Sequence, residues 1–205
     1  MNIFYKICLL LLINSFACHS QIFVRAYHYR PTGDFGSVFK PGFSAEIGYM
    51  PKFEERLRVC VSATYMVMKP RRDAFPIVGI QQGTKTVILP GEDRFDKYNL
   101  LHLFAGIDVA IIKRKKFFAY LGTDLTVGVG SVDSRTEVKT LISEGYSGGG
   151  GIAGFRGRIG LQYNLTDHIG LIAHVNRTGY ILTEPRTVNW FNDYGMGVRY
   201  HFGYR

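Results

Sequence analysis

The stretch from Asp193 to Tyr204 reads Asp-Tyr-Gly-Met-Gly-Val-Arg-Tyr-His-Phe-Gly-Tyr and alternates strictly between two kinds of side chain. One set is large and apolar or aromatic: Tyr194, Met196, Val198, Tyr200, Phe202 and Tyr204. The other set is small or polar: Asp193, Gly195, Gly197, Arg199, His201 and Gly203. A period of two indicates an extended strand, because successive side chains point to opposite faces. These two faces suit a strand that has lipid on one side and a filled polar interior on the other.

The same alternation recurs in seven further segments of the 205-residue chain. Together with the closing stretch, the expected strands are 22–30, 42–50, 57–68, 99–111, 117–129, 152–165, 169–181 and 192–203. Most of them reach the about 9–11 residues that a tilted strand needs to cross a bilayer. The first strand leaves two orientations open, because either Ile22, Val24 and Ala26 or Phe23, Tyr27 and Tyr29 can face lipid.

The connections between these segments alternate in length. Those after the second, fourth and sixth strands are short: 51–56, 112–116 and 166–168. Those after the first, third, fifth and seventh are longer: 31–41, 69–98, 130–151 and 182–191. Short periplasmic turns and long external loops are typical of bacterial outer-membrane barrels.

Two of the long loops have features of their own. Within the second long loop we expect a hairpin with arms 76–80 and 84–89, joined through residues 81–83. The third long loop ends in the four glycines of 148–151, which predict a mobile segment.

Residues 1–20 have the features of a secretory signal peptide, with a positively charged start, a short apolar core and small residues at the end. We expect cleavage after Ser20, which leaves 21–205 as a single barrel domain. The alternative is a lipidated Cys18. After cleavage Cys60 is the single remaining cysteine, so we expect no internal disulfide and interpret Cys60 as a buried small side chain.

Composition separates the membrane barrel from two alternatives. The formal net charge of +9 does not indicate nucleic-acid binding, because no basic stripe is interleaved with stacking aromatics. A soluble lipocalin-like barrel would turn its apolar face inward and leave the charged, glycine-rich face in water. The apolar faces instead carry tyrosines near the strand ends, as expected of an interfacial aromatic girdle: Tyr49, Tyr65, Tyr163, Tyr180 and Tyr204.

The chain resembles the family of small eight-stranded outer-membrane β-barrels of Gram-negative bacteria. The resemblance covers 21–205 and rests on the leader, the strand count, the loop asymmetry and the aromatic ending Tyr200-His201-Phe202. It implies an all-β, antiparallel, up-and-down transmembrane barrel in the outer membrane, delivered to the insertion machinery through its C-terminal strand. The ending is displaced from the usual position, since Gly203-Tyr204-Arg205 follows the aromatic residue.

Charged residues recur on the small and polar faces of the expected strands. An eight-stranded barrel is only wide enough for side chains to fill it, and buried charges are tolerated when they are paired. We therefore expect a closed barrel with an internal salt-bridge and hydrogen-bond network formed by Arg25, Glu46, Arg58, Asp108, Asp124, Arg156, Arg158, Asp193 and Arg199.

Three histidines, His102, His174 and His201, fall on the same polar faces, and we interpret them as members of this network rather than as metal ligands. We expect no cofactor, no metal and no catalytic activity. The enzymatic alternative is a lipid A-modifying protein of the deacylase kind. The sequence around His174 resembles that pattern only weakly, because Asn176 stands where the nucleophilic serine is expected, and no base is visibly paired with Ser62.

Exposed cations indicate where the barrel meets lipid phosphates. The expected contacts are the turn Lys113, Arg114, Lys115 and Lys116, and the loop residues Arg71 and Arg72. Expected partners are outer-membrane lipids and lipopolysaccharide, the insertion machinery and a larger envelope complex for secretion or uptake, but no nucleic acid. The expected role is structural or accessory. A narrow pore is the second alternative.

Overall fold

The computed structural model describes residues 20–51, 56–77, 80–82, 85–87, 91–138, 141–142, 146–181 and 188–202. The leader expected at 1–20 lies outside these residues apart from Ser20, and so do Cys18 and the last three residues. Eight long strands form the main body: β1 (Gln21–Pro31), β2 (Gly42–Met50), β3 (Leu57–Met68), β7 (Gly91–Lys113), β8 (Phe117–Val138), β10 (Tyr146–Asn164), β11 (Ile169–Ile181) and β12 (Val188–His201). The smaller elements are α2 (Gly33–Val38), β4 (Phe75–Ile77), β5 (Ile80–Gln82), β6 (Lys85–Val87) and β9 (Leu141–Ile142).

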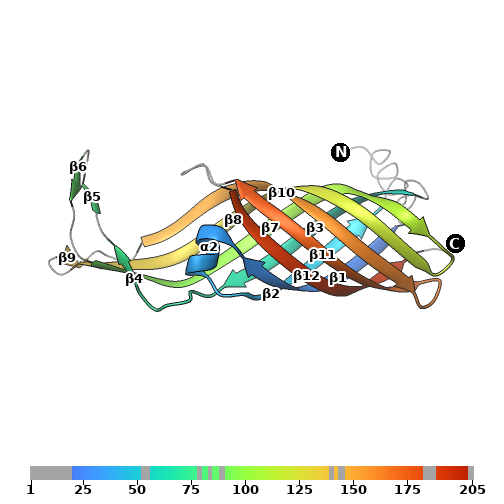
Figure 1. Ribbon diagram of the computed structural model, residues 1–205, viewed down its shortest axis with the longest axis horizontal. Helices are drawn as coiled ribbons and strands as arrows, with labels where there is room; N and C mark the ends of the chain where they lie inside the picture. Colours follow the sequence, from blue (N-terminus) through green and yellow to red (C-terminus); the bar gives the residue numbers. More distant parts are fainter. Residues whose placement is uncertain are drawn as a thin grey trace, which may run out of the picture.

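The long strands close into a barrel. Each pairs with its neighbour in the order β1-β2-β3-β7-β8-β10-β11-β12, and every pairing is antiparallel. The last strand returns to the first, with Gln21 opposite His201 and Pro31 opposite Phe191. In Figure 1, β1 begins and β12 ends at the end of the barrel opposite β4, β5, β6 and β9. The eight-stranded, antiparallel, up-and-down barrel expected from the sequence is therefore confirmed.

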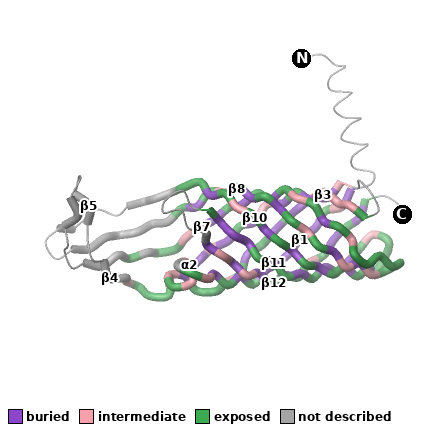
Figure 2. The backbone as a smooth tube through the Cα atoms, turned by 45° about the horizontal axis from the view of Figure 1, so that its top comes forward, coloured by how far each residue is buried: buried purple, intermediate pink, exposed green. Residues whose placement is uncertain are grey.

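Buried and exposed residues alternate along the barrel strands, as Figure 2 shows. In β1, Phe23, Tyr27 and Tyr29 are buried, whereas Ile22 and Val24 face outward. The sequence left this choice open. The register explains the outcome, because Arg25 shares the face of Phe23 and lies directly opposite Glu46, so this face turns inward where the charges can pair.

Glycines on the inner face make room for large rings. A Cβ atom at Gly48 would lie 2.0 Å from Cζ of Phe23, and one at Gly160 would lie 2.2 Å from Cζ of Tyr120. Both distances are far shorter than a van der Waals contact. The small residues on the polar faces thus accommodate aromatic rings from neighbouring strands inside a narrow barrel.

The assignment of Tyr180 to the aromatic girdle was wrong. Tyr65 and Tyr163 are exposed on the outer face and Tyr49 is half-buried, but Tyr180 is only 4% exposed and points inward. The reason is parity, since Tyr180 is an even number of residues from the inward-facing His174 on β11. Tyr204 lies outside the described residues.

The outer end of the barrel differs from the expected loops. The expected mobile glycines belong to β10, where Gly148–Gly151 pair with residues 129–132 of β8. Strands β7, β8 and β10 therefore continue beyond the predicted strand ends. The expected hairpin is present in a shorter form, with β5 paired to β6 through Ile80 opposite Val87, while Phe75–Ile77 pair with β7. The first loop contains the helical turn α2, which the sequence pattern did not predict. Among the described residues, no helix is long and apolar enough to span a membrane.

Two matched substitutions test whether lipid covers the outer face. Ile159 and Ile111 are exposed to nearly the same degree, 62% and 61%. Ile159 lies five residues from the end of β10 at Asn164, which is about 13 Å inside the barrel wall, whereas Ile111 lies only two residues from the end of β7 at Lys113. We predict that Ile159→Arg lowers the free energy of unfolding by about 2–4 kcal/mol and Ile111→Arg by about 0–1 kcal/mol. Urea unfolding in phospholipid vesicles measures both. Equal costs at the two depths would contradict a lipid-covered wall.

Candidate functional site

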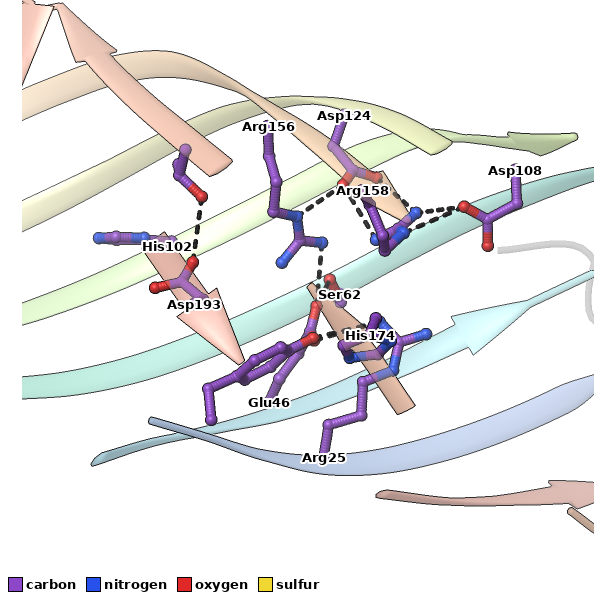
Figure 3. A network of polar contacts seen from close by, with 12 residues as sticks. Arg25, Glu46, Ser62, His102, Asp108, Asp124, Arg156, Arg158, His174 and Asp193 are labelled. Atoms are coloured by element: carbon purple, nitrogen blue, oxygen red, sulfur yellow. Dashed lines mark hydrogen bonds and ion pairs between the residues drawn. The ribbon is translucent and has the colours of Figure 1, made fainter. Parts of the chain in front are cut away.

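Six charged side chains form a continuous chain of ion pairs through the middle of the barrel, here called the ionic core. Its members are Arg25, Glu46, Asp108, Asp124, Arg156 and Arg158, and each has no more than 2% of its surface exposed. Arg156 joins two carboxylates, with Nε 2.6 Å from Asp124 Oδ2 and Nη2 3.1 Å from Glu46 Oε1. Arg158 joins Asp108 at 2.6 Å to Asp124 at 3.0 Å, and Arg25 lies 3.3 Å from Glu46. Figure 3 shows these contacts converging from opposite walls of the barrel.

The residues of the ionic core come from five strands, and the alternation along each strand turns their side chains into the barrel. Register places Arg25 of β1 opposite Glu46 of β2, and Asp124 of β8 opposite Arg156 of β10. The contact from Arg156 to Glu46 then crosses the interior. Three arginines and three carboxylates balance, which is the condition under which buried charges are tolerated.

Neutral groups complete the hydrogen bonding of Glu46. The hydroxyls of Tyr27 and Ser62 both donate to its carboxylate. The Arg25 guanidinium stacks on the ring of Phe23 at 3.7 Å, and that of Arg156 stacks on Phe104 at the same distance. These contacts hold the Glu46 carboxylate in one geometry.

The other three charges expected in the network make different contacts. Arg58 and Arg199 both donate to the side-chain oxygen of Gln162, at 2.9 Å in the case of Arg58. Arg58 also stacks on Phe118. Asp193 accepts a hydrogen bond of 3.2 Å from the hydroxyl of Thr178. These residues share the interior with the ionic core and extend the polar filling toward both ends.

The interior histidines bond to tyrosines. Nδ1 of His102 lies 2.7 Å from the Tyr180 hydroxyl, and Nδ1 of His174 lies 3.2 Å from the Tyr120 hydroxyl. His201 lies near the opposite end of the barrel, where it pairs in register with Gln21. The described residues contain no group of three or more His, Cys, Asp or Glu side chains placed to hold a metal ion.

The residues that the catalytic alternative would use make other contacts. Ser62 donates to Glu46 rather than to a histidine. Asn176 is buried at the position where the deacylase pattern requires serine, and His174 already bonds to Tyr120. Within the described part of the chain, the geometry favours packing over nucleophilic catalysis.

Apolar layers lie on both sides of the ionic core. Toward the outer end lies a cluster, here called the mouth cluster, of Tyr29, Phe39, Met66, Met68, Leu100, Ile152, Tyr180 and Phe191. Phe35 and Val38 of the α2 turn pack on it, and Figure 1 shows α2 at this end of the barrel. Toward the opposite end lie Phe23, Met50, Cys60, Tyr120 and Ile172. Cys60 is fully buried there.

Hydrogen bonds to backbone carbonyl groups hold the first loop at the outer end of the barrel, and the sequence did not predict them. Nε of Arg71 donates to the carbonyl oxygens of Gly36 and Phe39, at 2.6 and 3.0 Å. On the other side of the loop, the backbone N–H of Thr32 donates to the carbonyl of Trp190 at 2.8 Å. Arg71, expected at a lipid phosphate, thus uses its guanidinium to hold the loop. Arg72 and Lys113–Lys116 are exposed, as a phosphate contact requires.

No known protein-family model matches this sequence, and no curated protein is detectably similar to it. Among solved structures, it is similar to Neisserial surface protein A (NspA), with 19% sequence identity, a TM-score of 0.60 and coverage of 89% of this chain and 97% of that one. It is also similar to Ail, the attachment invasion locus protein of Yersinia pestis, in complex with the heparin analogue sucrose octasulfate. Here the identity is 14%, the TM-score 0.51, and coverage 90% of this chain and 98% of that one. At identities this low, the likeness establishes the fold.

The ionic core predicts a large effect of one atom-for-atom substitution. Glu46→Gln preserves the shape of the side chain but leaves Arg25 and Arg156 without their shared carboxylate. We predict a loss of about 3–5 kcal/mol in the free energy of unfolding, because an unpaired buried charge remains. Urea unfolding in vesicles measures it. The control Asp73→Asn, which removes one charge from an exposed position, should change stability by less than about 0.5 kcal/mol. Comparable stabilities of the two variants would contradict the prediction.

Proposed function

We propose that this chain, which has the fold of the small eight-stranded outer-membrane β-barrels, resides in the outer membrane as a closed, non-catalytic binding subunit. Its binding surface is the raised wall, defined as the outer ends of β7 (91–98), β8 (131–138) and β10 (146–151) with β4 and β9. Its partner is another envelope protein, in an assembly for secretion or uptake.

The observation that carries this proposal is the unequal length of the strands. Strand β7 has 23 residues and β8 has 22, whereas β1 has 11 and β2 has 9. At about 3.3 Å per residue and a tilt of about 40°, β7 rises about 58 Å, although the apolar band of such barrels is only about 25 Å tall. In Figure 1 the long strands extend past α2 toward β4 and β9. Ordered sheet beyond the membrane requirement is suited to contact with another protein.

The filled interior argues against conduction. The mouth cluster, the ionic core and the inner apolar layer succeed one another along the barrel, and the first loop is fastened over the outer end. An ion would have to displace buried side chains from every layer: closely packed apolar ones from the two clusters and ion-paired ones from the ionic core. A pore is therefore the less suitable role.

Two further surfaces suit other partners: the basic turn suits lipid phosphates, and the C-terminal strand suits the insertion machinery. Lys113–Lys116 form an exposed turn at the end opposite the raised wall, where each cation contributes about 1 kcal/mol near an anionic lipid surface. We assign this turn to inner-leaflet phosphates. Tyr200 and Phe202 project outward from the C-terminal strand, as recognition by the insertion machinery requires.

Site-specific photo-crosslinking in intact cells tests the raised wall. Lys97 of β7 and Lys115 of the opposite turn are both exposed lysines, so each is replaced in turn by a benzophenone amino acid. We predict a discrete higher-mass adduct from position 97 that mass spectrometry identifies as an envelope protein, and none of that mass from position 115. Absence of an adduct at position 97, or the same adduct from both positions, would contradict the proposal.

A further inference from the structure

On three neighbouring strands, the continuous run of apolar or aromatic outward-facing residues is first interrupted at the same row. On β1 the outward side chains run Ile22, Val24, Ala26, His28 and then Arg30. On β11 they run Ile169, Leu171, Ala173, Val175 and then Arg177. Asn192 of β12 lies between the two arginines, because it is opposite Arg30 on one side and opposite Arg177 on the other. Arg30, Asn192 and Arg177 therefore form one polar row on the outside of the barrel.

The height of this row corresponds to the outer boundary of the bilayer. From Gln21 to Arg30 the strand climbs about 23 Å at 3.3 Å per residue and a tilt near 40°, close to the about 25 Å of the apolar band. The row immediately below carries exposed aromatic residues, with Phe43 and Tyr194 on either side of His28. Apolar, then aromatic, then cationic side chains follow the order of hydrocarbon, interface and lipid headgroup.

The two arginines are available to an external anion. Both are exposed, and among the described residues Arg30 forms no ion pair and no side-chain hydrogen bond. The guanidinium of Arg177 stacks on Trp190 at 4.7 Å, and Trp190 is held by an edge contact with Phe155. Two strands apart, the Cα atoms of Arg30 and Arg177 are about 10 Å from each other, so both side chains can reach one ligand between them.

We propose that Arg30 and Arg177, with the amide of Asn192 between them, bind a phosphate monoester of the lipid A headgroup in the outer leaflet. The planar guanidinium forms paired hydrogen bonds with phosphate oxygens, and a doubly charged phosphate neutralises two neighbouring cations. Trp190 acts as a positioning residue, since its ring holds the Arg177 guanidinium at the edge of the apolar wall. The inference rests on the outer-membrane location given under the proposed function.

Native mass spectrometry of the full chain in detergent, titrated with bisphosphorylated lipid A, tests the site. We expect Arg30→Gln/Arg177→Gln to weaken binding about tenfold or more, since charge-assisted hydrogen bonds are lost from both arginines. Arg30→Lys/Arg177→Lys keeps the charges without the planar fork and should lose part of the affinity. The matched control is Lys40→Gln/Lys69→Gln, which removes two neighbouring exposed cations at the same end of the barrel and should bind as wild type does.

Titrations with other ligands distinguish lipid A from other sources of phosphate. Lipid A stripped of its phosphates should bind the wild-type chain about tenfold more weakly, and neither phosphatidylglycerol nor inorganic phosphate should displace bisphosphorylated lipid A. Wild-type affinity in the double glutamine variant, an equal loss in the lysine control, or displacement by phosphatidylglycerol or inorganic phosphate would overturn the proposal. Unheated gel mobility verifies that each variant is folded. If only the double glutamine variant misfolds, wild-type affinity in Arg30→Lys/Arg177→Lys overturns the proposal.

Cell fractionation separates this inference from the proposed function. If the chain is absent from the outer membrane, the proposed location fails, while the binding measurement on purified protein still reports on the arginine pair. If the chain is in the outer membrane and its lipid A binding does not depend on phosphate, the inference alone fails.

Discussion

The ion pairs between Arg156 and its two carboxylates are the contacts on which the interior depends. Arg156 reaches Asp124 on the adjacent strand and Glu46 across the barrel, so it ties opposite walls together. Buried charges in a narrow barrel are tolerated when they are paired, and the pairs must therefore form as a set. The orientation of β1 follows from the same requirement, since Arg25 has to face Glu46. Side chains alternate between the two faces of each strand, and this alternation places the balanced charges inside the barrel and the apolar side chains against lipid.

The interior of the barrel is filled in layers. The ionic core and the apolar layers fill the part within the membrane, and the α2 loop is fastened over the outer end by Arg71 and Thr32. The binding surfaces that we propose therefore lie outside the barrel: the raised wall above the membrane, and the polar row of Arg30, Asn192 and Arg177 at its boundary. A barrel that is closed inside and varied outside is suited to binding rather than to transport.

The two-residue period predicted the strands accurately where apolar and polar side chains alternate. The expected strands 42–50, 57–68 and 169–181 agree with β2, β3 and β11 to the residue. It failed at Gly148–Gly151, because glycines have no side chain whose alternation can be seen, although they pair with β8. The inward charges were recognised by parity, whereas the contact from Glu46 to Arg156 and the hold of Arg71 on backbone carbonyls depend on the closed barrel. The change from apolar to cationic outward residues at Arg30 and Arg177 can be read in the sequence, but only strand register brings the two arginines together.

The most direct test of the ionic core is a double-mutant cycle on Asp108 and Arg158, which lie 2.6 Å apart with both side chains fully buried. Asp108→Asn, Arg158→Gln and the double variant are compared with wild type by urea unfolding in phospholipid vesicles. We predict that the double variant loses less stability than the sum of the single variants, with a coupling energy of about 0.5–3 kcal/mol. Additive losses, equal to the sum within about 0.3–0.5 kcal/mol, would contradict an ion-paired interior.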